Sequence, residues 1–170
     1  MIRTLVRSVA FLLLNGVAAA AEPTVITLQR TECFGTCPAY AVSASSDGRI
    51  LYRGDRHVAA VGLREATASV QEMQRLLDAV DAAKFDELRG DYSLYGNDCE
   101  RFATDNPTQI ITVVREGKEK RVEYYFGCSG AKIDADLTRL RKLGDAIDEI
   151  LDTAQWVGTV EPKWQQTGMR

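Results

Sequence analysis

The sequence predicts an α+β fold in which an antiparallel sheet of four or five strands carries two amphipathic helices packed on one face. Three observations lead to this prediction. Segments with strand periodicity occur in pairs, a segment with helical periodicity follows each pair, and the connections within a pair are short. Short connections favour antiparallel pairing, and a helix with a single apolar stripe has to bury it against another layer.

The first strands are expected to form a hairpin that continues into a short meander. Residues 24–30 alternate apolar and polar side chains, as a half-buried strand does. Residues 39–45 and 49–53 follow, and Asp47-Gly48 between them is a strong short-range hairpin signal. A further short segment at 57–61 is predicted to extend the meander.

The first helix has a clear start signal. Ser69 and Glu72 match a capping box, in which a hydroxyl and a carboxylate each accept from an N–H that would otherwise be unpaired. An apolar stripe with spacings of three and four follows and ends near Phe85. Its members are Val70, Met73, Leu76, Leu77 and Val80.

Residues 88–108 are predicted to be a long loop, because they show no sustained period and are rich in turn-forming residues. Loops of this length are often functional.

The second hairpin comprises 109–115 and 119–126, joined around Gly117. Five aromatic residues in and beside these segments could line a surface groove: Tyr92, Tyr95, Tyr124, Tyr125 and Phe126. For Tyr124 and Phe126, packing in the core is the simpler explanation.

The last helix has the clearest apolar stripe in the chain. Asp134 or Asp136 can begin it, because an acidic side chain complements the positive end of the helix dipole. The stripe consists of Leu137, Leu140, Leu143, Ile147, Ile150 and Leu151. From Trp156 onward the chain becomes polar and is expected to fray.

The N-terminal residues have the order of a secretory signal peptide. Arg3 and Arg7 precede an apolar run at 9–14, and small residues follow at 18–21. The run is far shorter than the roughly 20 residues that cross a hydrocarbon core. We therefore expect a signal peptide at 1–21 and no membrane span after its cleavage. The mature protein would have one α+β domain at 22–154 and a polar C-terminal tail at 155–170, and would be periplasmic or secreted.

The charge balance argues against one class of partner. Loss of Arg3 and Arg7 with the signal peptide leaves 19 basic against 24 acidic side chains, a formal charge of −5. An acidic surface of this kind does not favour a nucleic acid as partner.

Four cysteines in an exported chain predict two disulfides. Cys33, Cys37, Cys99 and Cys128 allow three connectivities, and the sequence does not choose among them. We favour Cys33 with Cys37, since Gly35 permits the tight bend of a short loop. Cys99 with Cys128 would then close a loop of about 30 residues, which contributes about 3–4 kcal/mol by the chain-entropy argument.

No catalytic set or cofactor site stands out. His57 is the only histidine, and residues 127–130 do not match a nucleophile elbow. Residues 91–102 superficially resemble a calcium loop, but Phe102 stands where the bidentate carboxylate is required. Zinc held by four cysteines is disfavoured, because export favours their oxidation. We accordingly predict no catalytic residue, no metal and no cofactor. The candidate surface site consists of Phe34, Tyr40, Asp98, Glu100 and Asp105.

The segment Cys33-Phe-Gly-Thr-Cys-Pro-Ala-Tyr40, followed by the first hairpin, a helix and Asp105-Asn-Pro-Thr108, resembles a bacterial domain of unknown function, family 6438. The resemblance covers about residues 25–128. In that family the segment stands near the start of the domain, often behind an export or lipoprotein signal, and no activity is established. The resemblance implies a bacterial setting and makes Cys33 with Cys37 the natural pair. It supplies no catalytic residue.

We therefore expect an exported bacterial protein, a non-catalytic envelope or extracellular binding or structural module stabilised by disulfides, with an envelope or extracellular protein as partner. One alternative is a thiol-disulfide or redox-responsive protein that uses Cys33 and Cys37. A second is a metal-assisted hydrolase that uses the acidic 91–105 loop.

Overall fold

The structure, a computed structural model, describes residues 22–96 and 98–158. The predicted signal peptide and residues 159–170 of the predicted tail lie outside the described residues. The elements in chain order are β1 (Val25–Arg30), β2 (Ala39–Ser45), β3 (Arg49–Arg56), β4 (Gly62–Thr67), α1 (Val70–Ala82), the 3₁₀ turn η1 (Phe85–Glu87), β5 (Asp91–Tyr92), β6 (Arg101–Phe102), β7 (Thr108–Arg115), β8 (Lys118–Tyr125), β9 (Cys128–Ser129), α2 (Asp134–Ile150) and α3 (Ala154–Val157).

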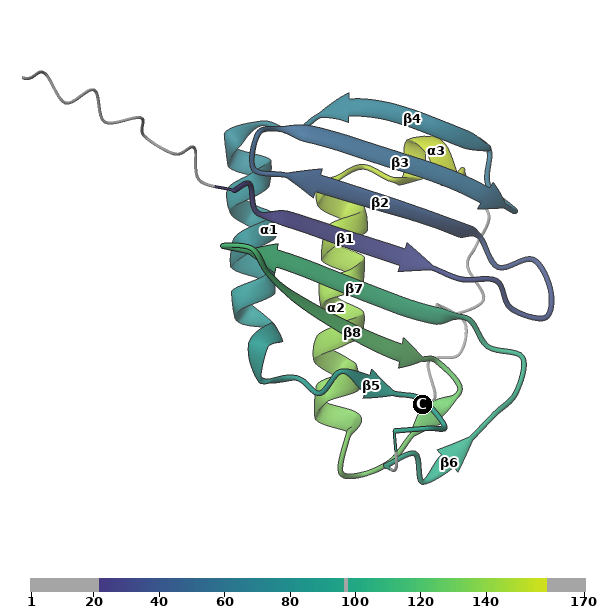
Figure 1. Cartoon of the computed structure of the whole chain (residues 1–170). Coiled ribbons are helices and arrows are strands. Elements are labelled where there is room, and N and C mark those ends of the chain that lie inside the picture. Colours follow the sequence, from purple (N-terminus) through teal and green to yellow (C-terminus); the bar gives the residue numbers. More distant parts are fainter. Residues whose placement is uncertain (1–21, 97, 159–170) are drawn as a thin grey trace, which may run out of the picture.

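Seven strands form the main sheet, in the order β4-β3-β2-β1-β7-β8-β5 (Figure 1). Neighbouring strands are antiparallel except β5 and β8, which are parallel. A separate two-stranded sheet joins β6 to β9. The predicted α+β class is confirmed, whereas the predicted count of four or five strands is wrong.

The additional strands lie where the sequence has little strand periodicity. The meander is predicted to continue at 57–61, but the strand β4 begins only at Gly62. His57 has a φ of 54°, which takes the chain out of the extended conformation. Because β4 is an edge strand with no buried residue, its side chains do not alternate between apolar and polar. The strand β5 has two residues, too few to show a period, and lies inside the segment predicted to be a loop.

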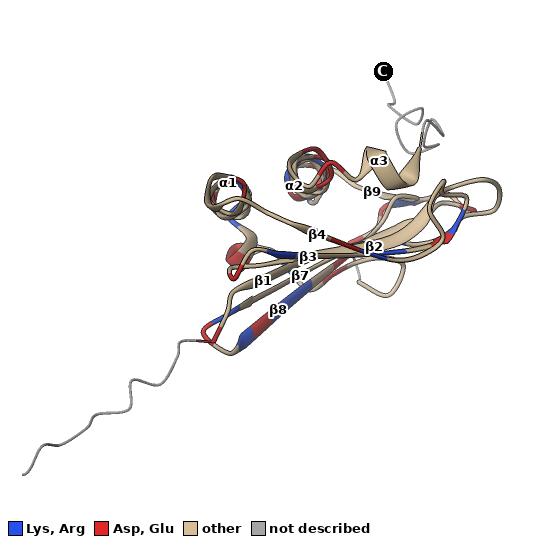
Figure 2. Ribbon diagram, turned by 90° about the horizontal axis from the view of Figure 1, so that it is seen from above, with Lys and Arg blue, Asp and Glu red and all other residues tan. Residues whose placement is uncertain are grey.

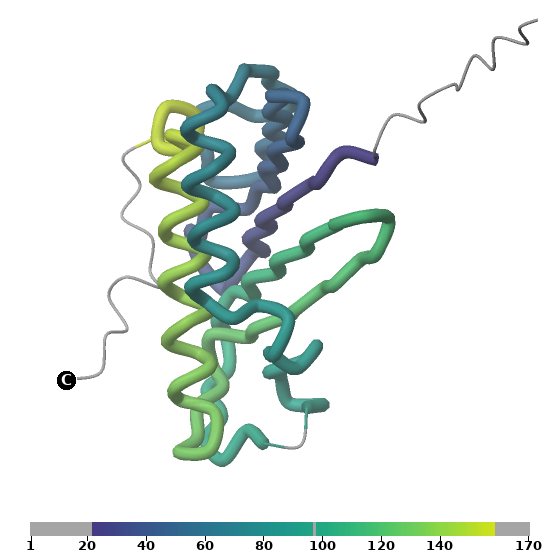
Figure 3. The backbone as a smooth tube through the Cα atoms, turned by 90° about the vertical axis from the view of Figure 1, so that its left-hand side faces the viewer, coloured from purple at the N-terminus to yellow at the C-terminus, as the bar shows by residue number. Residues whose placement is uncertain are grey.

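Helices α1 and α2 lie side by side on one face of the sheet, and no helix of the described residues covers the other face, which we call the open face (Figures 2 and 3). The predicted capping box of α1 is confirmed. Ser69 Oγ accepts a hydrogen bond from the Glu72 amide at 3.2 Å, and Glu72 Oε2 accepts one from the Ser69 amide at 2.6 Å. Val70 is part of the predicted apolar stripe, but it lies in the first turn of α1 and its side chain is 81% exposed. Helix α2 begins at Asp134, the first of the two predicted starts.

The core fills the space between the two helices and the sheet. Five strands and both helices contribute fully buried side chains to it, among them Ile26, Leu28, Val42, Tyr52, Ile111, Tyr124, Leu76 and Ile147. Complete burial of an aliphatic or aromatic side chain of this size contributes about 1.5–3 kcal/mol. Within the described residues, the helices are all too short or too polar to cross a membrane.

The short helix α3 closes one end of the core. Trp156 and Val157 are buried, although the prediction places both in the polar tail. The Trp156 ring stacks on Tyr52 with centroids 4.9 Å apart. The amides of Ala59 and Ala60 donate to the carbonyls of Val157 and Trp156 at 3.1 and 2.8 Å. These contacts come from a segment almost 100 residues earlier, so a local pattern cannot reveal them.

A buried polar network joins α2 to the sheet. Arg30 is 2% exposed, and its Nε and Nη2 donate to Asp148 Oδ2 at 2.9 and 2.7 Å. Its Nη1 donates to Gln109 Oε1 at 2.9 Å. The hydroxyls of Tyr40 and Thr153 donate to Asp148 Oδ1 at 2.7 and 2.8 Å. Burial and the neighbouring Asp148 carboxylate raise the pKa of Tyr40, so its hydroxyl stays protonated and donates.

Candidate functional site

Two disulfides fix the loops at one end of the sheet. They join Cys33 to Cys37, with Cα atoms 5.6 Å apart, and Cys99 to Cys128, with Cα atoms 5.3 Å apart. The favoured connectivity is therefore the one in the structure, and it leaves no cysteine free. The second bridge ties the predicted 88–108 loop to β9, directly after the end of β8.

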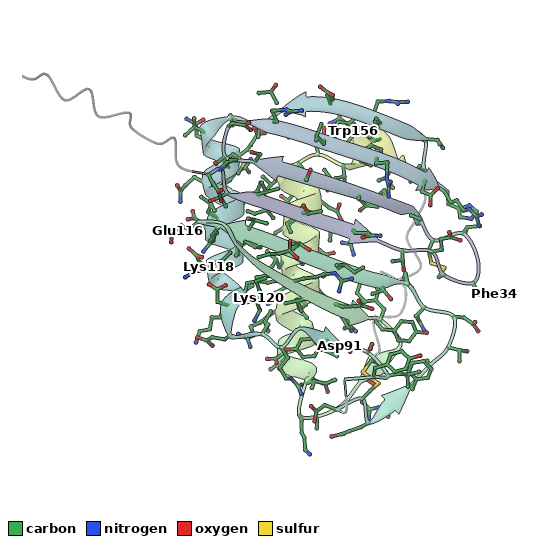
Figure 4. All side chains as sticks on the ribbon, in the orientation of Figure 1. Phe34, Asp91, Glu116, Lys118, Lys120 and Trp156 are labelled. Atoms are coloured by element: carbon green, nitrogen blue, oxygen red, sulfur yellow. A yellow bond between two sulfur atoms is a disulfide. The ribbon has the colours of Figure 1, made fainter. Side chains whose placement is uncertain are left out.

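The loop closed by the first disulfide lies beside the end of the 88–108 segment. The strands β1 and β7 are antiparallel neighbours, so the end of β1 adjoins the start of β7. Thr31 N donates to Thr108 O at 3.0 Å, and Phe34 N donates to Asp105 O at 3.3 Å. The Phe34 side chain is 80% exposed at the far end of its loop (Figure 4). Two of the predicted site residues, Phe34 and Asp105, are thus neighbours through their backbones.

Another predicted site residue lies elsewhere. Tyr40 is 4% exposed and belongs to the network around Asp148, so it is not a surface residue. It occupies a helix-facing position of β2, because its cross-strand neighbours Arg30 and Gly54 both face the core.

The three acidic candidates each have a local partner. Asp98 forms an ion pair with Arg89. Glu100 Oε2 accepts from the Ala131 amide at 3.2 Å, and Asp105 Oδ2 accepts from the Thr104 hydroxyl at 2.9 Å. Within residues 22–96 and 98–158, no three His, Cys, Asp or Glu side chains gather as metal ligands would. The contacts that the carboxylates make here are those of loop-stabilising groups.

A hollow of about 290 Å³ lies on the open face of the sheet, where β5 and β8 end and β7 begins. Among the described residues it is lined by Ser93, Leu94, Tyr95, Phe102, Thr108, Glu123 and Tyr125. Tyr95 is 88% exposed, Leu94 52% and Phe102 41%. The rings of Phe102 and Tyr125 stack with centroids 5.1 Å apart. Four apolar or aromatic side chains thus meet at a concave surface that is open to solvent.

The strand β5 positions one side of the hollow. Its parallel register places Asp91, labelled in Figure 4, beside Glu123. The same register places Tyr92 beside Tyr124 in the core. The Tyr92 hydroxyl donates to Asp136 Oδ2 at 2.7 Å, which anchors β5 to α2.

The turn after β5 carries Leu94 and Tyr95. Asp91 Oδ1 accepts from the Ser93 amide at 2.8 Å, and Ser93 O accepts from the Gly96 amide at 3.0 Å. A Cβ atom at Gly96 would lie 2.7 Å from the Asp91 carbonyl oxygen. The tight return of this turn therefore requires glycine, and it holds Leu94 and Tyr95 at the rim.

The opposite side of the hollow depends on Tyr125. Its hydroxyl donates to Ala103 O at 2.9 Å and accepts from the Asn106 amide at 3.2 Å. These two bonds hold the segment after β6 against β8, and Phe102 is stacked on the Tyr125 ring as a result.

The charge in the hollow is negative. Glu123 is the single charged side chain among the described lining residues, and Asp91 is its cross-strand neighbour. Arg121, two residues earlier on the same face of β8, contacts Glu123 at 3.0 Å. Both members of that pair are partly exposed, and such pairs contribute about 0–1 kcal/mol.

The aromatic residues that the sequence suggests for a groove do not all lie on one face, because successive residues of a strand point to opposite faces of the sheet. Tyr124 is buried, and Tyr125, the next residue, faces the hollow. No pattern in the sequence indicates that Phe102 and Glu123 belong to the site, because only the fold brings the 88–108 segment over β8.

A smaller and more polar hollow of about 140 Å³ lies beside the first disulfide loop, and the residues around it include Arg30, Tyr40 and Arg53.

The chain matches a protein-family model. The family model of a domain of unknown function, DUF6438, matches residues 24–151. These residues include both disulfides and every described residue that lines the larger hollow. No curated protein matches the chain.

Proposed function

The chain belongs to the DUF6438 family of domains of unknown function, and from this premise we propose that it is an exported, non-catalytic bacterial module that binds a protein of the envelope or extracellular space. The binding site in this proposal is the hollow lined by Leu94, Tyr95, Phe102 and Tyr125.

The exposure of that aromatic cluster is the observation that carries the proposal. Concave apolar surfaces rimmed by polar groups mark interaction sites on proteins. Tyrosine and phenylalanine are enriched in the centre of protein interfaces, where their large rings exclude water. An 88% exposed Tyr95 next to a 52% exposed Leu94 leaves apolar surface in water that a partner could cover.

Export is supported by the N-terminal order of charged, apolar and small residues at 1–21. Two disulfides agree with it, because such bonds persist in oxidising compartments such as the periplasm and the extracellular space. Their role in this proposal is to hold the loops around the hollow, since Cys99 lies three residues before Phe102.

The test uses the mature chain from Glu22, immobilised and exposed to an envelope extract. A specific partner should be retained by the wild type and lost with Tyr95→Asp, which places a charge in the hollow. The matched control is Leu63→Asp, because Leu63 is 70% exposed on β4 at the opposite edge of the same sheet. The retained protein is then purified and titrated against the same three chains.

If the Tyr95→Asp and Leu63→Asp variants retain the partner equally, the hollow is not the binding site. Turnover of a substrate in a broad hydrolase screen would overturn the non-catalytic assignment. Near-ultraviolet circular dichroism of both variants establishes that each keeps the native packing.

The redox alternative has one observation in its favour. Cys33 is half-buried at the base of an exposed loop, although its partner Cys37 is only 1% exposed. Equilibration with glutathione decides between the two roles. A Cys33–Cys37 disulfide that stays oxidised at the redox potential of the glutathione pool has a structural role, whereas one that exchanges readily with glutathione supports a redox function.

A further inference from the structure

We propose that the hollow between Tyr95, Phe102, Tyr125 and Glu123 binds a cationic side chain, the ammonium of a lysine or the guanidinium of an arginine, on the protein partner. This inference rests on the proposed function and names the chemical group that the same site recognises.

The aromatic rings supply one half of the recognition. A cation within about 6 Å of an aromatic centroid is attracted by the negative face of the ring. Phe102 and Tyr125 present two nearly parallel rings, 24° apart in plane, and Tyr95 adds a third ring from the turn after β5. The aliphatic stem of a lysine or arginine would pack on the same rings and on Leu94.

The carboxylate supplies the other half. Glu123 is the single charged side chain among the described residues of the lining, and Asp91 stands beside it on β5. Arg121 already contacts Glu123 at 3.0 Å, so a cation can reach this carboxylate in the folded protein. A partner cation would compete with Arg121, and the weakness of an exposed pair makes this competition feasible.

The size of the hollow favours a single side chain. A volume of about 290 Å³ is at the lower limit of small-molecule pockets, which range from about 300 to 1,000 Å³. A phosphocholine lipid headgroup also carries a quaternary ammonium, but a phosphate accompanies it. The described lining offers no lysine or arginine for that phosphate, and Glu123 and Asp91 would repel it. The observations therefore favour a protein side chain over a lipid.

The primary experiment is a titration of the ¹⁵N-labelled mature chain with N-acetyl-lysinamide, followed by amide chemical shifts. N-acetyl-norleucinamide is the neutral control, because it keeps the apolar stem and lacks the ammonium. We expect shifts at Leu94, Tyr95, Phe102 and Glu123 with the lysine probe. The norleucine probe should bind about fivefold more weakly or worse, because it loses both the ring contacts of the cation and the carboxylate.

Four variants sharpen the test. Glu123→Gln should weaken the lysine probe by about two- to fivefold, the range of an exposed ion pair. Glu119→Gln is the matched control, because Glu119 is exposed on the same strand and face but lies outside the hollow, and it should leave binding unchanged. Arg121→Gln should strengthen binding, since it removes the competing cation. Tyr95→Ala should weaken binding, and because Tyr95 is 88% exposed, its truncation removes no side chain from the packed core.

Equal binding of the lysine and norleucine probes, or insensitivity to Glu123→Gln, would overturn the inference. Binding of phosphatidylcholine vesicles that depends on Tyr95, without binding of the lysine probe, would assign the hollow to a lipid instead. The two proposals fail separately. A purified partner that responds to Tyr95→Asp but not to Glu123→Gln leaves the binding module standing, whereas a positive lysine titration without any Tyr95-dependent partner overturns only the proposed function.

Discussion

Arg30 and Asp148 are joined inside the protein by two hydrogen bonds, of 2.9 and 2.7 Å, from one guanidinium to a single carboxylate oxygen. The residues are 118 positions apart, and the pair ties the C-terminal part of α2 to the end of β1. Removal of the Asp148 carboxylate takes away the close counter-charge of the buried guanidinium and leaves the exposed Asp145 carboxylate at 3.4 Å, which is more costly than the loss of an exposed pair.

Asp148→Asn is therefore expected to lower the free energy of unfolding by about 3–5 kcal/mol, as measured by urea denaturation. Asp145 is the matched control, because its carboxylate contacts the same Arg30 nitrogen at 3.4 Å but its side chain is 62% exposed. Asp145→Asn should cost about 1 kcal/mol or less. Equal effects of the two substitutions would contradict a central role for the buried pair.

Gly144→Ala should destabilise the protein, although alanine is normally favoured by about 1 kcal/mol over glycine inside a helix. The added Cβ atom would lie 2.1 Å from Gln109 Oε1. Gln109 is held in place, because it accepts from Arg30 and its Nε2 donates to Leu140 O at 2.7 Å. We expect a loss of about 1–3 kcal/mol in urea denaturation. Lys142→Ala, an exposed change on the same helix, should stay within about 0.5 kcal/mol, and a stabilising Gly144→Ala would disprove the close packing.

Trp156→Ala should lower the free energy of unfolding by about 3–5 kcal/mol, because the indole is buried and stacks on Tyr52. Its neighbour Gln155 is exposed, so Gln155→Ala should change the free energy of unfolding by about 0.5 kcal/mol or less. Both are compared with the wild type by urea denaturation. A tolerated Trp156→Ala would place the end of the folded domain before α3.

The two disulfides should differ in their contribution to stability. By the chain-entropy argument, the 29-residue separation of Cys99 and Cys128 contributes about 3–4 kcal/mol, and the 4-residue separation of Cys33 and Cys37 contributes about 2 kcal/mol. Urea denaturation of the two double-alanine variants measures these losses without reductant. Mass mapping of non-reduced peptides checks the connectivity, and a peptide that joins Cys33 to Cys99 or Cys128 would contradict it.

The stability contributed by Asp136 should depend on pH in the acid range. Partial burial opposes ionisation of this carboxyl, but hydrogen bonds from the Tyr92 hydroxyl and from Arg139 outweigh it and lower its pKa. The unfolded chain then binds a proton more readily than the folded one, so the contribution is complete above about pH 4 and declines as the pH falls through the folded pKa.

Urea denaturation at pH 7 and pH 3 measures this effect. Wild type should be more stable than Asp136→Asn at pH 7, and the difference should shrink at pH 3. A difference that grows toward acid would contradict the lowered pKa.

The sequence by itself determined the features that depend on neighbouring residues. The capping box at Ser69 and Glu72 predicted the start of α1, and Asp47-Gly48 predicted the β2–β3 hairpin. The alternation around Gly117 predicted β7 and β8. Periodicity and turn chemistry are local, so these elements and the α+β class could be predicted without a structure.

Only the tertiary structure decided the features that join distant segments. Arg30 ends a strand and would be expected in solvent, but it is buried because Asp148 and Gln109 arrive from other elements. The hollow likewise combines Tyr95 from a turn with Tyr125 from a strand, and β5 is set by parallel pairing with β8 rather than by any period of its own. A long-range contact is not encoded in the spacing of neighbouring residues, and for that reason the packed core network and the candidate site emerged only from the fold.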